Sequence, residues 1–389
     1  MVPKRFADAS SIRRIPIDRH PSPQSVNYLS SRPKVTLDVA PLMETHWTGI
    51  PVFTRRLVQS LLRHGGVDLE FMIELTRVPA AAVMTAINAG TGVFLRERFE
   101  SSSAFASVVA DRTGCLLYPS VKSSFGVAKR EASTIHDLST LFMPEVHEES
   151  NIAYHLDAMA LELATDEVVF CISEATRAAL VSAFPSVAGK TRMVFQYVDW
   201  PAHFELMERN LPPLRLGPYA VVVGTIEPRK NLGLILSALS TPELRRSRLR
   251  FVVVGRKGWK VDQFMAALPA EAQDRVLFSG FVSEFAKYRL IKGSEFLVFP
   301  SVYEGFGIPA LEAMALGKPV LSSWSSSLPE VIGDAGVYFD PLSVTDFASA
   351  FATIAHPQKL AELSATATAN SAAFNWQRMA APVVEWALS

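Results

Sequence analysis

The stretch of residues 300–312, PSVYEGFGIPALE, decides the fold of this chain. The four residues before it, FLVF, form an apolar run that predicts a buried strand. Its two glycines let the backbone pass close to a ligand, and Pro309 suits the first turn of a helix. Because the free amides of a helix start favour an anion such as a diphosphate, the stretch predicts a strand, a phosphate-binding loop and a helix. Two acids, Glu304 and Glu312, flank that loop.

The rest of the chain repeats this alternation of strands and helices. A length of 389 residues suggests two domains, and the polar, proline-bearing stretch 199–218 separates two series of apolar runs. Such runs are typical of parallel strands covered on both faces. The predicted fold is therefore α/β, with two Rossmann-like doubly wound domains facing across a cleft that binds ligands. The predicted strands are Val35–Ala40, Leu69–Leu75, Cys115–Tyr118, Thr134–His136, Val168–Ile172, Met193–Tyr197, Tyr219–Val223, Phe251–Val254, Val276–Ser279, Phe296–Phe299 and Val320–Ser322. The predicted helices are Val52–Arg63, Ile152–Ala164 and Glu174–Ala183.

The composition disfavours several kinds of partner and site. The chain has 38 basic and 38 acidic residues, whereas binding to a nucleic acid calls for a basic surface. Cys115 and Cys171 each lie in an apolar run, which predicts buried thiols and not a disulfide. The sequence has no apolar run long enough to span a bilayer and no apolar core of a signal peptide. We therefore expect a cytoplasmic protein.

Two segments leave a contact with a membrane open. Residues 1–33 are rich in proline, serine and arginine, which predicts a flexible leader. This leader is either a solvated tail or, through its basic residues, a contact with an anionic bilayer. The segment 79–102 is first apolar and then of mixed charge. It is either an ordinary packing helix or a helix pair that docks a lipid acceptor.

The two acids around the phosphate loop are candidates for binding sugars. Glu304 precedes the predicted helix, where its carboxylate could accept hydrogen bonds from sugar hydroxyls. Glu312 lies inside the helix and could bind a ribose diol while the loop amides hold phosphate. The alternative is that the two are an ordinary acid before a helix and a solvated helical acid. The intervening GFG and the upstream strand favour ligand binding.

A second motif, GTIEPRKN at residues 224–231, follows a predicted strand of the same half. Arg229 and Lys230 suit a diphosphate leaving group, because fixed cations stabilise the charge that grows as a glycosidic bond breaks. Asn231 could cap the following helix. Basic residues beside a helix start are common, and the second phosphate loop in the same half is what favours the functional interpretation.

Two further motifs place candidates in the first half of the chain. The run TIHDLS ends a predicted strand, so His136 would face the cleft and bind the transferred sugar or the acceptor. Asp137 would orient His136 or cap the next turn. Gly49, in TGIP, would let backbone amides approach a phosphate. The alternatives are a structural histidine and an ordinary loop glycine.

Several patterns are missing from the sequence. No G-x-G-x-x-G follows the first strand, which disfavours a nicotinamide cofactor, and no G-x-x-x-x-G-K-[ST] or G-x-S-x-G is present. The sequence also lacks an Asp-x-Asp that would hold a divalent ion on a nucleotide sugar. We expect neither a metal nor another cofactor, so that protein cations and helix dipoles would stabilise a diphosphate.

The motifs together resemble the retaining glycosyltransferases of family 4, which have the GT-B fold. The resemblance rests on GTIEPRKN, FVVVGRKGW, VLFSGFV and EGFGIPALEAMALGKPV, and it is dense over about 217–340. It is thinner over 35–200, where TGIP, IHDLS and ISEAT fit. The family implies a metal-independent transfer with retention at the anomeric carbon. It places the donor in the C-terminal domain (206–370) and the acceptor mainly in the N-terminal domain (34–205), and the segment 371–389 fits a last helix that crosses back to the N-terminal domain or lies on the surface.

The resemblance also implies roles for individual residues. Arg229 and Lys230 would hold the diphosphate, Glu304 would bind hydroxyls of the donor sugar, and His136 would lie near the transferred sugar. The family's usual mechanism is front-face attack, in which the departing phosphate deprotonates the acceptor hydroxyl. The donor-binding residues would further include Gly49, Gly224, Phe281, Val282, Phe306, Gly307, Ile308 and Glu312, with Phe281 and Val282 near the base and Glu312 on the ribose.

Two departures from the family pattern concern the first domain and the hinge. Pro51 and Val52 occupy the positions where a second glycine often follows, and Gln196 and Tyr197 replace an Asn-Gly pair before the linker. These changes put the donor contacts of the first domain and the hinge in doubt, but not the class of enzyme.

The resemblance is strongest to bacterial mannosyltransferases that build surface polysaccharides such as lipopolysaccharide. It implies a nucleotide-sugar donor, GDP-mannose as the first choice, and a saccharide or polyprenyl-diphosphate-linked acceptor, with possible peripheral contact with the cytoplasmic face of the inner membrane. A UDP- or dTDP-linked hexose or GDP-fucose remains open as donor. A nucleotide-sugar epimerase, a sugar phosphorylase and a non-enzymatic sugar-nucleotide-binding module remain alternatives.

Overall fold

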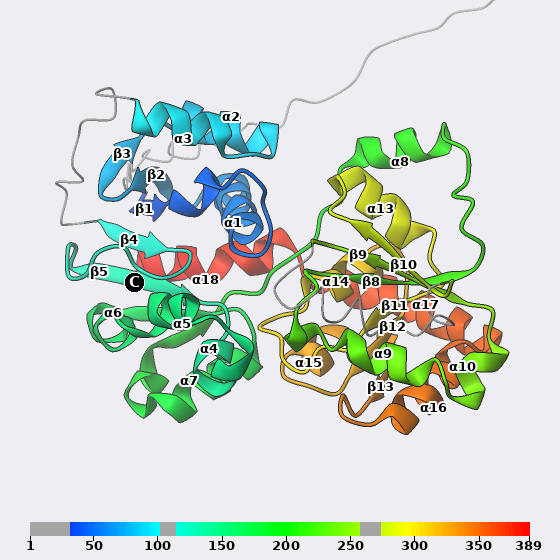
Figure 1. Cartoon of the computed structure of the whole chain (residues 1–389). Helices are drawn as coiled ribbons and strands as arrows, with labels where there is room; N and C mark the ends of the chain where they lie inside the picture. Colours follow the sequence, from blue (N-terminus) through cyan, green and yellow to red (C-terminus); the bar gives the residue numbers. More distant parts are fainter. Residues whose placement is uncertain (1–31, 102–113, 257–273) are drawn as a thin grey trace, which may run out of the picture. The chain divides into compact units, whose positions relative to one another are not determined.

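The computed structural model describes residues 32–101, 114–256 and 274–389 (Figure 1). Most of the predicted leader (1–33) and most of the GRKGW run (255–259) lie outside these residues. The last residue of the segment 79–102 lies outside them as well. The described part contains two sheets, one in each half of the chain.

The first sheet has seven strands in the order β3-β2-β1-β4-β5-β6-β7. All neighbouring strands are parallel except β2 and β3, which form an antiparallel hairpin. Its strands are β1 (Lys34–Asp38), β2 (Asp68–Ile73), β3 (Thr76–Val78), β4 (Cys115–Tyr118), β5 (Arg130–Ile135), β6 (Val168–Cys171) and β7 (Thr191–Met193).

The second sheet has six strands, all parallel, in the order β10-β9-β8-β11-β12-β13. Every residue of β8, β11 and β12 is buried, as expected for strands covered by helices on both faces. Its strands are β8 (Tyr219–Val223), β9 (Arg250–Val254), β10 (Val276–Gly280), β11 (Leu297–Phe299), β12 (Val320–Ser323) and β13 (Gly336–Phe339).

Helices follow most strands, as in doubly wound folds. The α-helices of the first half are α1 (Ile50–His64), α2 (Ala80–Ala89), α3 (Val93–Glu100), α4 (Ser139–Phe142), α5 (Glu149–Leu156), α6 (Met159–Thr165) and α7 (Glu174–Ala183). Those of the second half are α8 (Ala202–Arg209), α9 (Leu232–Ala238), α10 (Pro242–Arg246), α13 (Glu284–Lys292), α14 (Ile308–Met314), α15 (Leu328–Ile332), α16 (Val344–Ile354), α17 (Pro357–Ala372) and α18 (Trp376–Leu388).

The last helix, α18, packs against α1 of the first half. The Trp386 ring lies edge-on to Phe170 of β6, with ring centroids 6.0 Å apart. The Arg130 guanidinium donates to the backbone carbonyls of Trp386 (2.6 Å) and Ala387 (3.3 Å), which fixes the carbonyl end of the helix.

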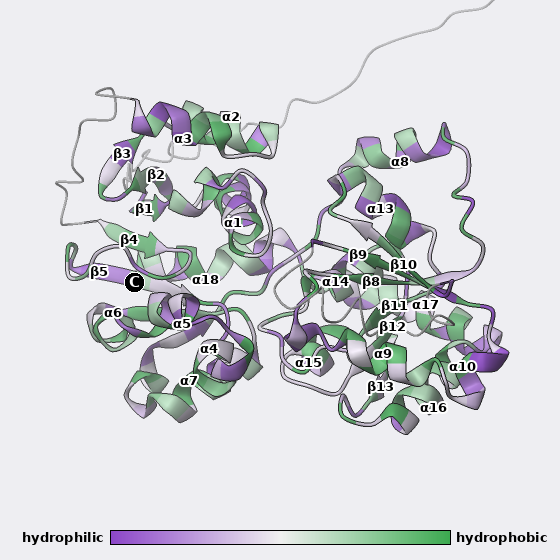
Figure 2. Cartoon of the chain, viewed as in Figure 1, coloured by the Kyte–Doolittle hydropathy of each residue, from purple (hydrophilic) through white to green (hydrophobic). Residues whose placement is uncertain are grey.

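Several predicted elements differ from the structure. β5 begins at Arg130, four residues before the predicted strand at 134–136. The prediction began too late because buried polar residues interrupt the apolar run of this strand. Its first residues have the hydrophilic colour in Figure 2. The predicted strand at 193–197 ends at Met193, and the chain continues outside the ladder. The single helix predicted at 152–164 is two helices, α5 and α6, separated at Asp157 and Ala158.

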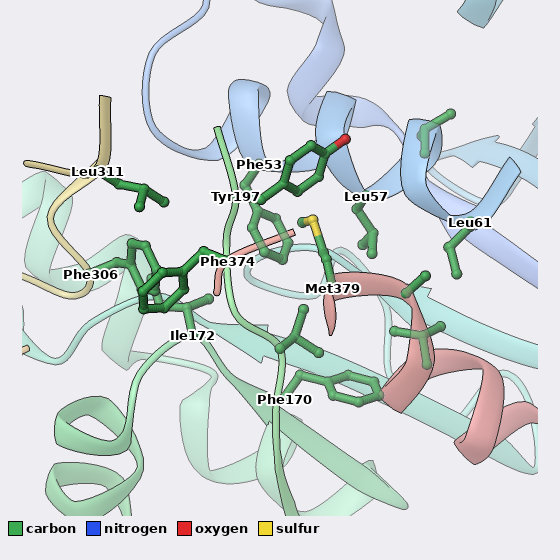
Figure 3. Packing of buried hydrophobic residues seen from close by; sticks show 14 of the residues in the cluster. Phe53, Leu57, Leu61, Phe170, Ile172, Tyr197, Phe306, Leu311, Phe374 and Met379 are labelled. Atoms are coloured by element: carbon green, nitrogen blue, oxygen red, sulfur yellow. The ribbon is translucent and has the colours of Figure 1, made fainter. Parts of the chain in front are cut away.

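A hydrophobic cluster contains side chains from both sheets and from α18. Figure 3 shows Phe306, from the loop after β11, beside Phe374, and their ring centroids are 5.6 Å apart. Phe53 of α1 and Met379 of α18 belong to the same cluster. Burial of this much apolar surface holds the loop after β11 against the first half of the chain.

Candidate active site

A cavity of about 910 Å³ is lined by loops and helix starts from both halves of the chain. All twelve residues that the sequence singled out for catalysis or donor binding line this cavity. They are Gly49, His136, Gly224, Arg229, Lys230, Phe281, Val282, Glu304, Phe306, Gly307, Ile308 and Glu312.

Glu304 is held between two cations. Its Oε1 lies 2.5 Å from Lys230 Nζ, and its Oε2 lies 3.2 Å from Arg229 Nη1. The residue is only 7% exposed. Although burial raises the pKa of a carboxyl, Lys230 and Arg229 hold the pKa of Glu304 below its usual value. Glu304 is therefore ionised, and the two cations share its single negative charge.

Arg229 has several further partners. Its Nη2 lies 2.8 Å from Glu227 Oε1, and its Nη1 donates to the backbone carbonyl of Tyr303 at 2.7 Å. Burial lowers the pKa of Arg229, but Glu304 and Glu227 raise this pKa by more than burial lowers it. The net pKa is raised, so the guanidinium stays charged. These contacts fix the guanidinium in one orientation at the cavity wall.

Asn231 does not cap the following helix as predicted. Its backbone is left-handed (φ 53°), and its side chain makes no capping hydrogen bond. Instead, Nδ2 donates to the backbone carbonyls of Pro300 (3.2 Å) and Pro341 (2.8 Å). Asn231 thus ties the turn that carries the two cations to the end of β11.

His136 lies at the end of β5, and its ring is neutral. Its Nε2 lies 2.7 Å from the carbonyl oxygen of Pro119, and because a carbonyl only accepts, Nε2 carries the proton. Burial lowers the pKa of His136. The ring packs edge-on to Phe53, with centroids 4.7 Å apart. Its Nδ1 is therefore left as a hydrogen-bond acceptor.

Asp137 begins a chain of hydrogen bonds along the first half. Its Oδ1 accepts from the backbone N–H (2.9 Å) and the hydroxyl (2.6 Å) of Ser139. The Ser139 oxygen lies 2.9 Å from His147 Nε2, and Asn151 Nδ2 lies 3.1 Å from His147 Nδ1. Although burial raises the pKa of Asp137, Arg229 and Ser139 hold it below its usual value.

Glu312 has a partner that the sequence did not reveal. The residue is 3% exposed, and its Oε1 lies 2.6 Å from Lys287 Nζ of α13. The Lys287 ammonium also lies 5.5 Å from the centroid of the Trp200 ring. Lys287 lines the cavity, but nothing in its sequence neighbourhood distinguishes it from other surface lysines.

Phe281 forms an exposed aromatic surface at the cavity mouth. It is 51% exposed, and the Arg256 guanidinium lies 4.7 Å from its ring centroid. The His46 ring lies 5.3 Å away on centroids. Sequence reasoning identified Phe281 but neither of these neighbours.

The loop of residues 304–307 passes very close to the first half of the chain at Gly305. A Cβ at Gly305 would lie 2.1 Å from the carbonyl oxygen of His136 and 3.0 Å from Asp137 Cβ. The Thr176 hydroxyl lies 3.2 Å from the carbonyl oxygens of both Gly305 and His136. Gly307, the residue before α14, has a left-handed φ of 100° that favours glycine. Sequence reasoning expected Gly305 to let the backbone approach a ligand, but it predicted neither this contact with the first half of the chain nor a role for Thr176.

The described residues contain neither a cluster of metal-ligating side chains nor a membrane-spanning helix. No group of three His, Cys, Asp or Glu side chains there is placed to hold a metal ion. No helix in the same ranges has the length and apolar character needed to cross a membrane. A contact of the leader with a bilayer stays a prediction.

Comparison with known proteins places this geometry in context. Residues 211–370 match the family model described as Glycosyl transferases group 1. The chain is 31% identical over 223 residues to the O-antigen chain mannosyltransferase B of Escherichia coli, covering 56% of this chain and 58% of that protein. It is 23% identical over 228 residues to the O-antigen chain mannosyltransferase RfbU of Salmonella typhimurium, covering 58% of this chain and 61% of that protein. The matches thus span a little over half the length of these relatives.

Solved structures share the architecture over most of the chain. Sucrose-phosphate synthase from Thermosynechococcus elongatus aligns with a TM-score of 0.64 at 18% identity, covering 91% of this chain and 98% of that chain. WaaG, a glycosyltransferase involved in lipopolysaccharide biosynthesis, aligns with a TM-score of 0.58 at 16% identity, covering 90% and 98%. The two Rossmann-like sheets thus form the GT-B fold, as the sequence predicted.

Proposed function

We propose that this chain, whose residues 211–370 are a glycosyl transferases group 1 domain, transfers a hexose from a nucleotide sugar to a saccharide acceptor. The observation that carries the proposal is Glu304, which is buried between Arg229 and Lys230 in a cavity lined by both halves of the chain. Such a site offers fixed cations for a diphosphate and a carboxylate for sugar hydroxyls.

Arg229 and Lys230 would hold the diphosphate of the donor. Negative charge grows on the diphosphate as the bond to the sugar breaks, and fixed cations stabilise that charge most in the transition state. Because both cations are paired with Glu304 without a ligand, the diphosphate would replace one carboxylate partner with another anion. Glu304 would then turn to the sugar hydroxyls, and Glu312 and Phe281 would hold the ribose and the base.

We further propose that the transfer retains the anomeric configuration and needs no metal. The departing phosphate would take the proton of the acceptor hydroxyl, so that no protein base is required. The neutral His136 ring, with Nδ1 as an acceptor, would orient a hydroxyl of the transferred sugar. Arg229 and Lys230 would supply the positive charge that a metal ion would otherwise provide at the diphosphate.

Mannose from GDP-mannose is the donor that we propose, and a saccharide of surface polysaccharide synthesis is the acceptor. The mannosyltransferase names of the two enterobacterial relatives support this choice. The alternative is a UDP- or dTDP-linked hexose or GDP-fucose in the same site. An epimerase would release free nucleotide and sugar without an acceptor, and a phosphorylase would require phosphate.

The test is a transfer assay with purified protein and a panel of GDP-, UDP- and dTDP-linked sugars, in the presence of EDTA. We expect GDP-mannose to give the highest rate and a product with an α-linkage, with full activity in EDTA. A rate that EDTA abolishes and magnesium restores would refute the metal-free mechanism. Nucleotide release without any glycosylated product, for every donor and acceptor, would refute the transferase.

A further inference from the structure

Beyond His136, the cavity continues to a region between α5, α6 and the turn after β4. We call this region the α5–α6 pocket and define it by Ser120, Asn151, His155, Met159 and Glu162, all of which line the cavity. It belongs entirely to the first half of the chain, whereas the two cations and Glu304 belong to the second.

Glu162 of α6 is the one acid that lines this pocket among the described residues. Only 1% of its surface is exposed. Its Oε1 has no hydrogen-bond partner within the described ranges. A buried carboxyl oxygen without a partner is costly, and a hydroxyl group of a ligand in the cavity would satisfy it.

Lys122 lowers the pKa of Glu162, but its ammonium is ion-paired with two other acids. Lys122 Nζ lies 2.5 Å from Glu131 Oε2 and 3.0 Å from Asp166 Oδ1, and all three side chains are fully buried. Burial and the neighbouring Asp166 raise the pKa of Glu162 to about 7. Near neutral pH its carboxyl is therefore protonated in part of the molecules, so it can both donate to and accept from a sugar hydroxyl.

Asn151 offers a second group with defined polarity. The Ser139 hydroxyl donates to Asp137, so its oxygen accepts from His147 Nε2–H. An amide nitrogen only donates, so His147 Nδ1 accepts from the Asn151 amide nitrogen. The Asn151 amide oxygen is left as an acceptor for a second hydroxyl.

None of the five described residues that define the α5–α6 pocket carries a positive charge. The lysines and arginines that line the cavity in the described residues come from α1 or from the second half; they are Arg55, Arg229, Lys230, Arg256 and Lys287. Arg55 is paired with Glu284, and Lys287 with Glu312. Burial lowers the pKa of His155, which keeps its ring neutral. A phosphate group in this pocket would have no countercharge, and nearby carboxylates would repel it.

We propose, on the basis of the function proposed above, that the α5–α6 pocket binds the acceptor as a neutral, hydroxyl-bearing sugar and rejects sugar phosphates. Glu162 Oε1 and the Asn151 amide oxygen each bind one hydroxyl of that sugar. The acceptor therefore enters by an uncharged sugar end, and any diphosphate that links it to a lipid stays outside the pocket.

The experiment measures saccharide binding by NMR saturation transfer and titration, with GDP present. The probes are a panel of neutral mannose disaccharides and mannose 6-phosphate. The variants are Glu162→Met, which keeps the size but removes the polar oxygens, and Asn151→Ala, a milder change on α5. Glu149→Gln, at an exposed position of the same helix, is the control.

We expect Glu162→Met to weaken disaccharide binding about tenfold or more, as the loss of a hydrogen bond to a buried carboxyl predicts. Asn151→Ala should weaken it severalfold, Glu149→Gln should leave it unchanged, and GDP should bind all variants alike. Equal disaccharide binding by the wild type and both site variants would overturn the proposal. So would preference for mannose 6-phosphate, or no binding of any disaccharide.

Failure of the proposed function would look different. If the protein neither binds GDP nor transfers sugar, yet loses disaccharide binding in Glu162→Met, the transferase is wrong and the saccharide pocket stands. If GDP binds and transfer occurs, but Glu162→Met keeps its affinity for disaccharides, the pocket is wrong and the transferase stands.

Discussion

The substitution Glu304→Gln tests the ion pairs at the centre of the site. It removes one negative charge that Lys230 and Arg229 share, and the side chains of these two cations are each 15% exposed. Arg229 keeps Glu227 at 2.8 Å, so the main loss is the partner of Lys230. Removing one member of a buried pair costs about 3–5 kcal/mol of stability. Because the pair between Arg229 and Glu227 remains, we expect a loss at the lower end of this range, about 3 kcal/mol. At about 2–4 °C per kcal/mol, Tm should fall by about 6–12 °C.

The same substitution should affect the ligand in the opposite direction. In the wild type, a diphosphate must compete with Glu304 for Lys230, whereas in the variant the ammonium is free. GDP should therefore bind Glu304→Gln at least as tightly as the wild type, by up to about tenfold. Turnover should still fall by about 100-fold or more, because the amide no longer positions the sugar as the carboxylate does.

Thermal melting and calorimetry with GDP measure both effects. The control is Glu362→Gln, which removes an exposed partner of Lys359 on α17 and should change stability by less than about 1 kcal/mol. The reasoning is refuted if Glu304→Gln melts like the wild type, or if its GDP affinity falls as far as that of a variant lacking Lys230.

Three further predictions concern neighbouring groups. Lys230→Ala should weaken GDP about tenfold or more but leave guanosine within about twofold, measured by calorimetry; equal losses for both ligands would contradict a diphosphate contact. Gly305→Ala should reduce turnover at least about 100-fold, because its Cβ would lie 2.1 Å from the His136 carbonyl oxygen, whereas Gly189→Ala, with nothing within 4 Å and no positive φ, should retain turnover. The pKa of Glu162 is raised from 4.5 to about 7, so the native state binds its proton more tightly than the unfolded chain. The contribution of Glu162 to the free energy of unfolding is complete below the pKa of the unfolded chain. As pH rises through about 7, this contribution is lost, and the free energy of unfolding falls by about 3 kcal/mol. In urea titrations Glu162→Gln should lose this decline, and an unchanged pH profile would contradict the assignment.

The sequence predicted the fold because the strands of the second sheet are buried on both faces. Their continuous apolar runs, such as Tyr219–Val223, are typical of buried parallel strands, and the prediction followed from that pattern. Prediction was weaker where burial involves polar groups. β5 contains Glu131, which is buried against Lys122 and the backbone amides of residues 126–128, so hydropathy does not identify its first residues as a strand.

β3 was not predicted for a different reason. The turn before it puts Glu74 and Leu75 at φ values of 47° and 63°. Non-glycine residues seldom adopt this region, and the usual signals of such a hairpin are Asn-Gly or Asp-Gly. The sequence Glu-Leu therefore carries no mark of the turn that reverses the chain into β3.

For the candidate site, the sequence identified residues but not their partners. Motif spacing placed Glu304 and Arg229 on separate loops of the second half, and the structure brings them together within hydrogen-bonding distance. Lys287 and Thr176 were missed because their roles depend on packing between elements distant in sequence. Glu162 was missed for the same reason, since a helical glutamate is usually solvated.

The pairing of Glu304 with both cations has a consequence for the two ends of the donor. A buried carboxylate stays ionised only while partners compensate its charge, and in this structure Lys230 and Arg229 do so. When a diphosphate takes those cations, Glu304 needs new hydrogen-bond donors, and sugar hydroxyls at the same place would supply them. A nucleoside diphosphate without its sugar leaves Glu304 uncompensated, whereas the intact nucleotide sugar satisfies cations and carboxylate together. Under the proposed function, the site would therefore favour the whole donor over the nucleotide product, which would assist release of the product after transfer.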